Sequence, residues 1–279
     1  MSRSLSSQLA TSGPVDLLMH DSRAIIGFDG NKADAVEGLA ELGHELGDLQ
    51  EKLFAGGRSG ESATRVLLVL QGMDTSGKGG IVRNVAGLVD PQGLRIASFK
   101  SPTRDELAHD FLWRITRALP GPGMIGVFDR SHYEDVLVGK VRHLADPAEI
   151  ERRYLAINQF EKDFTESGGT IIKCFLNINA DDQKQRLAAR LDDPTKFWKY
   201  NPSDVDERML WTDYQHAYTV ALDRCSTQAA PWHIVPAGRK WYRNWAVAHL
   251  LVEHLRALDL DWPEAEFDVE AEKARLAAV

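Results

Sequence analysis

The chain has 279 residues, of which 43% are hydrophobic, and carries a formal net charge of −8. This length fits one large domain with extensions, and the apolar content is enough for a substantial core. The acidic balance excludes a basic nucleic-acid-binding protein, so a site for polyanions would need a local cluster of cations.

Cysteine usage and the absence of apolar runs bear on the compartment. Cys174 and Cys225 stand in unrelated contexts without metal-ligand spacing, which predicts two buried free thiols and a reducing cytoplasm. The first residues lack the apolar segment of a signal peptide. The longest clear apolar run is Val66–Leu70, far short of the ~18 residues that a membrane span needs. We therefore expect a cytoplasmic protein that binds no membrane.

Residues 1–31 carry little periodicity, but the next segment does. Apolar residues recur every three or four positions at Val36, Leu39, Leu42, Leu46, Leu49 and Leu53. This spacing predicts an amphipathic helix that ends at Gly56-Gly57. Its apolar stripe packs on the domain or joins copies of the chain in a homo-oligomer, a dimer or tetramer. We assign residues 1–60 to an N-terminal tail and helical extension.

From residue 65 strands and helices alternate. We predict strands over 66–70, 95–99, 124–128, 170–176 and 232–235, and helices over 104–119, 147–167 and 241–258. Repeated strand–helix units indicate an α/β fold in which a parallel sheet is covered by helices on both faces. Ligands bind such sheets at the carboxyl ends of the strands.

Two later segments interrupt this rhythm. Residues 181–224 are expected to form two helices separated by the polar stretch DDPTKFWKYNPSD, and residues after Asp261 an acidic surface helix or frayed end. We therefore divide the rest of the chain into a core over 61–262, with a lid at about 181–212, and an acidic C-terminal tail over 263–279.

A phosphate-binding loop follows the first predicted strand. QGMDTSGKGG fits GxxxxGK, with a buried strand before it and a helix after it. Backbone N–H groups of such a loop point at phosphate oxygens, and the lysine adds a mobile cation. An ordinary glycine-rich turn is the alternative. The candidate phosphate-binding residues here are Gly72, Thr75, Ser76, Gly77, Lys78, Gly79 and Gly80.

The loop departs from its usual pattern at one position. Gly79 stands where a Ser or Thr hydroxyl normally ligates Mg²⁺. A carboxylate among phosphate-binding amides is costly unless a cation lies beside it. Asp74 is therefore a metal candidate. Alternatively, its side chain caps loop amides.

A second acidic strand end supports a metal site. Residues 124–128 form an apolar run that ends in Asp129, as in a Walker-B strand, whose carboxylate meets Mg²⁺ beside the loop. Arg130 follows and could clamp phosphate oxygens. Glu134 could contact the metal shell or the acceptor, or serve only as an acid at a helix N-terminus. We expect His132 to be structural.

The stretch 183–199 is locally basic. It holds five cations and two anions, a local charge of +3 in a chain of −8. We predict a lid that closes on phosphates, with Arg186 and Arg190 on one helix face. A solvated charged face is the alternative. Lys196 and Lys199 of this stretch are further candidates for binding phosphates, and Arg83 and Lys100 could extend this positively charged surface.

Five sequence blocks together resemble one known family. They are QGMDTSGKGG, SFKSPTRDELAHDFLWR, GVFDRSHYEDVL, RLDDPTKFWK and APWHIVPAGRKWYRNW, in that order between about residues 30 and 258. The set is similar to the polyphosphate kinase 2 family. SHYEDVL and HDFLWR are most similar to its class III branch, although that branch often has Asp in place of Gly79 and Asn in place of Asp129.

The resemblance implies a P-loop kinase fold similar to thymidylate kinase, with a lid, and reversible Mg²⁺-dependent transfer between polyphosphate and nucleoside phosphates. Mn²⁺ could replace Mg²⁺. By motif, Asp74 and Asp129 would hold metal, and Lys78 and Arg130 would bind phosphates. Arg186 and Arg190 would come from the lid. The class III branch implies that both AMP and ADP are acceptors.

We therefore expect a polyphosphate kinase that makes ATP or ADP by in-line transfer to a nucleotide. A general base is not required, because an acceptor phosphate is already anionic. An ATP-dependent nucleotide kinase of the same fold is the first alternative, and a non-catalytic nucleotide-binding module the second. A GTPase is disfavoured because the chain has no NKxD motif.

Overall fold

The computed structural model describes residues 3–11 and 13–279. Its centre is a five-stranded parallel sheet in the order β2-β3-β1-β4-β5. The strands are β1 (Arg65–Gln71), β2 (Leu94–Ser98), β3 (Ile125–Asp129), β4 (Gly169–Asn177) and β5 (Trp232–Pro236). All five predicted strands are confirmed to within two residues.

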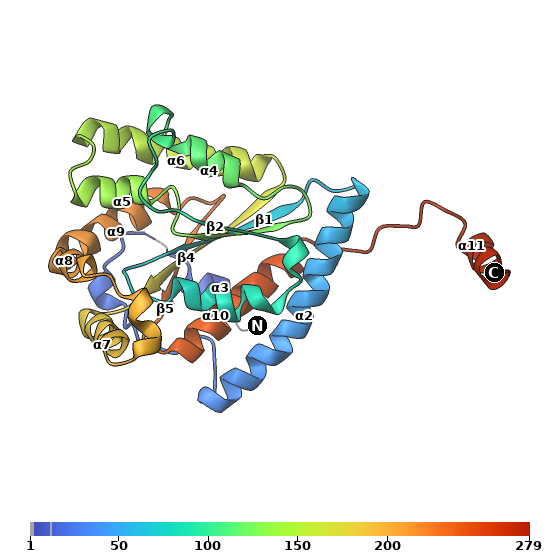
Figure 1. Cartoon of the computed structure of the whole chain (residues 1–279), viewed down its shortest axis with the longest axis horizontal. Helices are drawn as coiled ribbons and strands as arrows, with labels where there is room; N and C mark the ends of the chain where they lie inside the picture. Colours follow the sequence, from blue (N-terminus) through green and yellow to red (C-terminus); the bar gives the residue numbers. More distant parts are fainter. Residues whose placement is uncertain (1–2, 12) are drawn as a thin grey trace.

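Helices cover both faces of this sheet (Figure 1). Helices α4, α5, α6 and α9 lie on one face, and α2, α3 and α10 lie on the other. The α-helices are α1 (Leu5–Leu9), α2 (Lys32–Ser59), α3 (Lys78–Asn84), α4 (Leu112–Ala118), α5 (Glu134–Val141), α6 (Pro147–Glu166), α7 (Ala180–Leu191), α8 (Ser203–Met209), α9 (Trp211–Cys225), α10 (Lys240–Arg256) and α11 (Val269–Ala277). Short 3₁₀ turns are η1 (Leu17–Met19), η2 (Ala86–Leu88), η3 (Pro91–Gly93), η4 (Glu106–Ala108) and η5 (Pro194–Lys199). The three-layer α/β/α prediction is confirmed.

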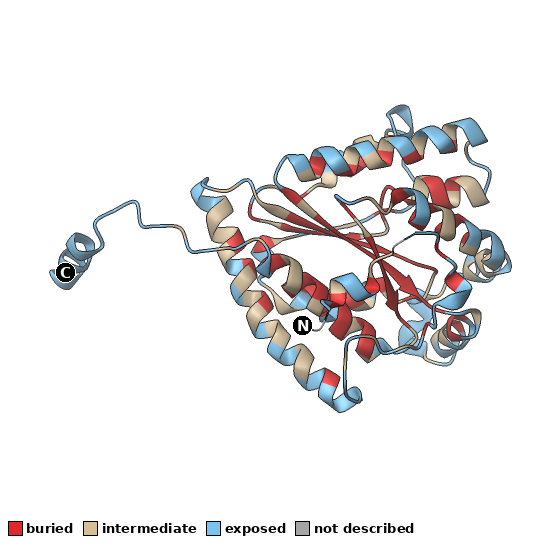
Figure 2. Cartoon of the chain, turned by 180° about the vertical axis from the view of Figure 1, so that it is seen from behind, coloured by how far each residue is buried: buried red, intermediate tan, exposed pale blue. Residues whose placement is uncertain are grey.

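Strand register brings the predicted site residues to one edge of the sheet. Leu70 of β1 pairs with Asp129 of β3 on one side and with Cys174 of β4 on the other. Strands β1, β3, β4 and β5 are almost entirely buried, as Figure 2 shows by colour, whereas no residue of the edge strand β2 is buried. The chain leaves β1 and β3 at the same edge, where the phosphate loop and Arg130 follow directly. Cys174 and Cys225 are buried free thiols, as predicted.

Helix α2 is longer than predicted. It passes through Gly56 and Gly57 and ends at Ser59, followed by Gly60 in the left-handed conformation at φ 80°. Gly57 lies against Gly123, and a β-carbon on Gly57 would come within 2.4 Å of the Gly123 backbone. The glycine therefore permits close packing inside the helix. The stripe of α2 packs along α10, with Leu46 buried.

The helix predicted over 104–119 is wrong in its first half. The chain there forms the short turn η4 and then α4, which begins only at Leu112. The Asp110 side chain accepts a hydrogen bond from the Leu112 backbone N–H at 3.0 Å, and His109 is extended. An aspartate that bonds the local backbone competes with the helix, and this favours a break before it.

The segment 181–224 has more elements than the two predicted helices. It contains most of α7, then η5, α8 and α9. Two prolines account for the extra breaks: Pro194 opens η5 behind its cap Asp193, and Pro202 precedes α8. Helices α7 and α8 lie at the end of the molecule opposite the C-terminus (Figure 1).

The N-terminal segment packs on the domain. The Leu5 and Ser6 backbone N–H groups each donate to the Glu253 carboxylate of α10 at 2.8 Å. Further along, Thr11 N donates to Trp232 O at 2.8 Å, beside the edge strand β5. Leu5 and Leu9 are buried. The tail thus covers the β5 edge of the sheet.

The C-terminal segment leaves the domain. After Leu260, which still packs on the core, the chain extends away and carries α11, none of whose residues is buried (Figures 1 and 2). We call residues 261–279 the C-terminal arm. It contains the predicted surface helix. Among the described residues, no helix is long and apolar enough to cross a membrane.

Candidate active site

The phosphate loop joins β1 to α3. Gly72 and Gly77 have φ angles of 146° and 113°, and Thr75 is left-handed at 66°. A β-carbon on Gly72 would lie 2.7 Å from the Leu176 carbonyl oxygen, so the backbone requires glycine there. The Lys78 ammonium bends back and donates to the Gly72 carbonyl at 2.7 Å. These contacts form the tight loop that the sequence predicts.

Asp74 lies within the loop and faces Arg130. The Arg130 Nη2 atom donates to Asp74 Oδ1 at 2.9 Å. The two side chains remain 37% and 26% exposed, so both can be reached from solvent. Arg130 follows the end of β3 in a left-handed conformation, with φ of 66°. The structure therefore brings together the loop carboxylate and the arginine that the sequence singled out.

The charges of this site converge on Lys78. Burial lowers the Lys78 pKa, and Arg130 adds to this, while Asp74, Asp129 and Glu134 act in the opposite direction. For Asp74, burial alone would raise the pKa, but Lys78 and Arg130 outweigh it and hold the pKa below its ordinary value. The five side chains thus form one electrostatic cluster, and Asp74 is ionised near neutral pH.

Glu134 completes this cluster from the first turn of α5. Burial raises the pKa of its carboxyl above the ordinary value, although Arg130, Lys78 and Gln71 oppose the shift. Gln71, the last residue of β1, also donates to the Ser131 hydroxyl at 3.1 Å. The position of Glu134 fits either sequence interpretation, a contact to the site or an acid at a helix N-terminus.

The acidic groups fit a hard cation that is shared with a substrate. Among the described residues, no three His, Cys, Asp or Glu side chains come together as a metal cage. Mg²⁺ does not need one, because it binds through one or two carboxylates together with water and substrate phosphates. Asp74 and Asp129 supply that number of carboxylates, and the partly exposed Asp74 is accessible. The residues present therefore fit Mg²⁺.

Helix α7 contributes contacts to the loop backbone. Arg186 Nη1 donates to the carbonyls of Thr75 and Ser76 at 2.9 and 3.2 Å. Its Nη2 atom donates to the Ala237 carbonyl at 2.6 Å, after β5. Arg186 therefore ties the phosphate loop to the loop that follows β5. Arg190, one turn later, donates to the Lys199 carbonyl at 2.9 Å and pairs with Asp204.

Arg243 also contacts the phosphate loop, although no pattern in the sequence singles it out. This residue of α10 is 3% exposed, and its Nη1 atom donates to the Ser76 carbonyl at 3.2 Å. Its guanidinium fills the space where β-carbons of Gly77 and Gly80 would lie. Burial and the neighbouring Arg186 lower its pKa to about 10. Arg243 falls in the block APWHIVPAGRKWYRNW, which contributed to the family resemblance but to which the sequence assigned no role at this position.

The remaining predicted cations, Lys196, Lys199, Arg83 and Lys100, are exposed. Lys196 pairs with Asp193 at 2.7 Å, and Lys199 lies 4.8 Å from the Trp198 ring centroid. Lys196 also acts electrostatically on Lys240, whose pKa is lowered by burial and by Arg186, Arg243 and Lys196. Arg83 and Lys100 are exposed, on α3 and after β2.

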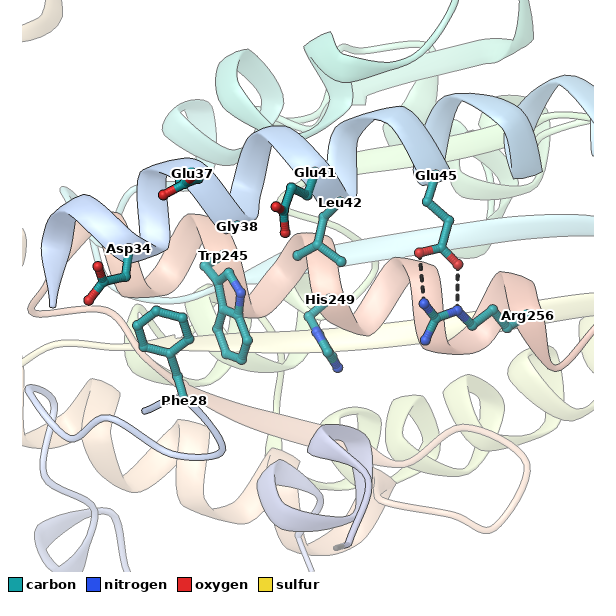
Figure 3. Close-up of a pocket in the computed structure, with 10 residues that line it drawn as sticks. All are labelled: Phe28, Asp34, Glu37, Gly38, Glu41, Leu42, Glu45, Trp245, His249 and Arg256. Carbon is teal, nitrogen blue, oxygen red and sulfur yellow. Dashed lines mark hydrogen bonds and ion pairs between the residues drawn. The ribbon is translucent and has the colours of Figure 1, made fainter. Parts of the chain in front are cut away.

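A separate groove of about 530 Å³ lies between α2 and α10 (Figure 3). Phe28, Trp245 and Leu42 form its apolar lining. Four carboxylates also line it, and Glu45 pairs with Arg256. This excess of negative charge disfavours a polyphosphate or nucleotide there, so the groove is not the phosphate site.

Comparisons with known proteins agree with this geometry. The family model described as Polyphosphate kinase 2 (PPK2) matches residues 30–262. The chain is 45% identical to the AMP/ADP-polyphosphate phosphotransferase of Meiothermus ruber, over 91% of this chain and 93% of that protein. It is 39% identical to the ADP-polyphosphate phosphotransferase of Rhodopseudomonas palustris, over 78% of each.

A solved structure shows the same fold. The crystal structure of Polyphosphate Kinase 2 from Arthrobacter aurescens TC1 superposes with a TM-score of 0.97 at 52% identity. The match covers 99% of this chain and 98% of that one. Sequence blocks, sheet order and the altered phosphate loop thus lead to one family, and the chain belongs to the polyphosphate kinase 2 family.

Proposed function

We propose that this enzyme reversibly transfers the terminal phosphoryl group of inorganic polyphosphate to ADP or AMP, making ATP or ADP. The observation that carries the proposal is the Asp74–Arg130 pair at the phosphate loop, beside Lys78 and Asp129. The names of the relatives support the substrate class, since the proteins from M. ruber and R. palustris act on AMP and ADP or on ADP.

The loop and Arg130 would bind the transferring group. The Ser76 and Gly80 N–H groups donate to the Met73 and Gly77 carbonyls. The other backbone N–H groups of the loop and the Lys78 ammonium would face the phosphoryl oxygens, and the start of α3 would add its dipole. Arg130 would leave its hydrogen bond to Asp74 and donate to phosphate oxygens instead, because a guanidinium can bind either a carboxylate or a phosphate. The site then stabilises charge that develops on the transferring group.

We propose Asp74 and Asp129 as the residues that hold Mg²⁺, or Mn²⁺ in its place. When bound, the cation supplies positive charge that neutralises the bridging phosphate oxygens. Asp74 stays ionised to receive it, because Lys78 and Arg130 keep its pKa low. The acceptor phosphate is an anion and attacks without a general base, so positioning by Lys78 and Arg130 is what the protein contributes.

We propose that residues 181–212 act as a lid over a core of residues 61–262. Arg190 is free to turn toward phosphates if its contacts to Asp204 and the Lys199 carbonyl open. Arg186 already donates to two carbonyls of the phosphate loop and to two carbonyls of the loop after β5. These contacts favour a role in holding the phosphate loop in place. Exposed Lys196 and Lys199 suit a long polyanion that crosses the lid.

A donor–acceptor matrix tests the function. The full chain is incubated with Mg²⁺, with polyphosphate or ATP as donor and with AMP, ADP, GMP or GDP as acceptor, and the products are separated by chromatography. We expect ATP or ADP to form from polyphosphate. Transfer from ATP alone would establish the nucleotide-kinase alternative, and tight nucleotide binding without turnover the regulatory one.

We also propose that the enzyme works in a reducing compartment such as the cytoplasm, which suits its two buried free thiols.

We further propose that the enzyme is a homo-oligomer. In the C-terminal arm, Trp262 and Phe267 are 51% and 62% exposed, and isolated helices as short as α11 are marginal in water. A surface of a second copy would bury these rings. Light scattering should give a dimer or tetramer for the full chain and a smaller species for the variant Trp262→Ser/Phe267→Ser. A monomeric full chain would contradict the assembly.

A further inference from the structure

A fully buried ionic network lies behind the turn that carries Arg130. Lys173 of β4 donates to Glu161 Oε2 of α6 at 2.5 Å, to the Tyr133 hydroxyl at 2.8 Å and to the Cys225 carbonyl at 2.6 Å. The Tyr133 hydroxyl in turn donates to Glu161 Oε1 at 2.7 Å. His132 Nε2 lies 3.2 Å from the same oxygen.

This network is closed to water. The side chains of Lys173, Glu161 and His132 are all 0% exposed, and Tyr133 is equally buried. The Lys173 ammonium also lies 5.1 Å from the Trp232 ring centroid. Replacing a buried ion pair by apolar groups is often neutral or stabilising, so such a pair is weakly explained by stability alone. A role in fixing one conformation is the better explanation.

The segment that this network holds is strained. Arg130 takes a left-handed φ of 66°, which costs energy for a residue with a β-carbon and persists only where its surroundings enforce it. On one side, the Arg130 N–H donates to the Leu70 carbonyl at 3.1 Å. On the other side, the chain is fixed through Ser131, whose hydroxyl accepts from Gln71 Nε2 and from the Tyr133 N–H.

Tyr133 is the point at which the strained turn meets the buried charges. It stands directly before α5, whose first residue is Glu134, and its carbonyl accepts from the Leu137 N–H at 2.9 Å. A shift of the Tyr133 ring would therefore move the start of α5, and with it Glu134. The same shift would displace the preceding residues of the turn, including Arg130. No other group in this turn bonds both members of the buried pair in the described structure.

We infer that Tyr133 is a positioning residue: its hydroxyl, held between Lys173 and Glu161, fixes the turn that aims Arg130 and Glu134 at the phosphate site. The inference rests on the proposed phosphotransfer for its kinetic test. Tyr133 touches no substrate in this account. Tyr133 affects turnover through the position of Arg130. A residue that only contributes to the core would affect stability and not the position of Arg130.

Two matched variants test the inference. Tyr133→Phe removes the bonded hydroxyl, and Tyr154→Phe removes a hydroxyl from another tyrosine of the core, 1% exposed, whose oxygen has no hydrogen-bond partner among the described residues. We expect Tyr133→Phe to lower kcat about tenfold to a hundredfold, with KM changed less than about threefold, because small displacements of a catalytic group have effects of this size. Tyr154→Phe should stay near wild type.

A double-mutant cycle shows whether the effect passes through Arg130. In an Arg130→Lys background, which already loses the correctly aimed guanidinium, Tyr133→Phe should lower kcat by less than about twofold further. A merely structural loss would instead multiply the two effects. If Tyr133→Phe does not fold, His132→Phe serves in its place, because it keeps a ring against Phe160 and removes the contact to Glu161.

A crystal structure of Tyr133→Phe supplies a readout that does not depend on activity. We expect the 2.9 Å pair between Arg130 and Asp74 to be broken and residues 130–134 to be displaced. An unchanged turn, a kcat equal to that of Tyr154→Phe, or fully multiplicative effects would each overturn the inference. Absence of turnover in the wild-type chain would contradict the proposed function instead, and the crystal structure would still decide the inference.

Discussion

Two carboxylate–cation pairs lie on either side of the turn after β3, and they differ in burial. Asp74 and Arg130 are 2.9 Å apart with 26% and 37% of their side chains exposed. Glu161 and Lys173 are 2.5 Å apart with neither exposed. The first pair can exchange partners with a phosphate or a cation, because water and ligands reach it. The second cannot, because any opening would leave a charge unpaired in the core.

The same kind of interaction can therefore be reactive or structural, according to whether water and ligands reach it. An exposed ion pair contributes about 0–1 kcal/mol to stability, so the protein can afford to open it during a reaction. A buried pair is costly to break. We therefore expect substitutions at Asp74 to affect turnover and substitutions at Glu161 to affect folding.

The largest expected effect is on stability. Glu161→Gln leaves the Lys173 ammonium buried without its counter-charge, and we expect the free energy of unfolding to fall by about 3–5 kcal/mol. Urea unfolding at pH 7 followed by circular dichroism measures it. The double variant Glu161→Gln/Lys173→Met is the control, because it removes both charges. Its loss should be clearly smaller, and an equal loss would show that the charges themselves are unimportant.

The next effect is on catalysis. Asp74→Asn keeps the shape of the side chain but removes the charge that we assign to metal binding, and kcat should fall by at least about a hundredfold. The unfolding free energy should change by no more than about 1 kcal/mol, because the pair with Arg130 is partly exposed. Asp129→Asn should behave in the same way. Turnover within about threefold of wild type for Asp74→Asn would refute its role.

A smaller effect is expected on the stability of the protein at low pH. Burial alone would raise the Glu161 pKa, but Lys173 and His132 outweigh it and lower the pKa below its ordinary value of 4.5. A carboxyl with a lowered folded-state pKa stabilises the protein above its unfolded-state pKa, and the contribution is lost as the pH falls through the folded-state value. We expect the unfolding free energy of wild type to approach that of Glu161→Gln/Lys173→Met below pH of about 4.5. Curves that stay parallel down to acid unfolding would contradict this.

The smallest effect is expected at Gly79. A β-carbon there would meet no atom within 4 Å, and the residue is exposed, so nothing in the packing demands glycine. Gly79→Ser should change the unfolding free energy by less than about 0.5 kcal/mol. It restores the hydroxyl that other phosphate loops use, yet kcat should change less than about threefold if Asp74 already fills that role. A large gain in kcat, measured at saturating Mg²⁺, would argue that the hydroxyl was missing.

Much of the fold and part of the site could be predicted from local patterns. Apolar runs predicted β1, β3, β4 and β5, because a parallel strand buried on both faces reads as a largely continuous apolar run, whereas the edge strand β2 is partly polar and not buried. The phosphate loop after β1 lies beside the end of β3, as predicted, because the carboxyl ends of neighbouring parallel strands lie at the same edge of the sheet. The break before Leu112 was missed, because the Asp110 side chain competes with the helix through a local hydrogen bond.

The long-range contacts could not be predicted in this way. Arg243 reaches Ser76 from a helix 167 positions later, and Arg186 binds the same loop from α7. The buried network joins Tyr133, Glu161 and Lys173 from separate elements. No spacing in the sequence marks such contacts, because they depend on how helices and strands pack. Gly56 and Gly57 misled the prediction of α2 for the same reason, since Gly57 allows close packing against Gly123.

A single-turnover experiment follows the phosphoryl group from polyphosphate to the nucleotide. Polyphosphate labelled in its terminal phosphoryl group is incubated with Mg²⁺, AMP or ADP, and excess enzyme, and the label is followed through a single turnover. We predict that wild type passes the label to the distal phosphate of the nucleotide and that Asp74→Asn does so at least about a hundredfold more slowly. Failure of wild type to label any nucleotide, or equal rates for both proteins, would contradict the account.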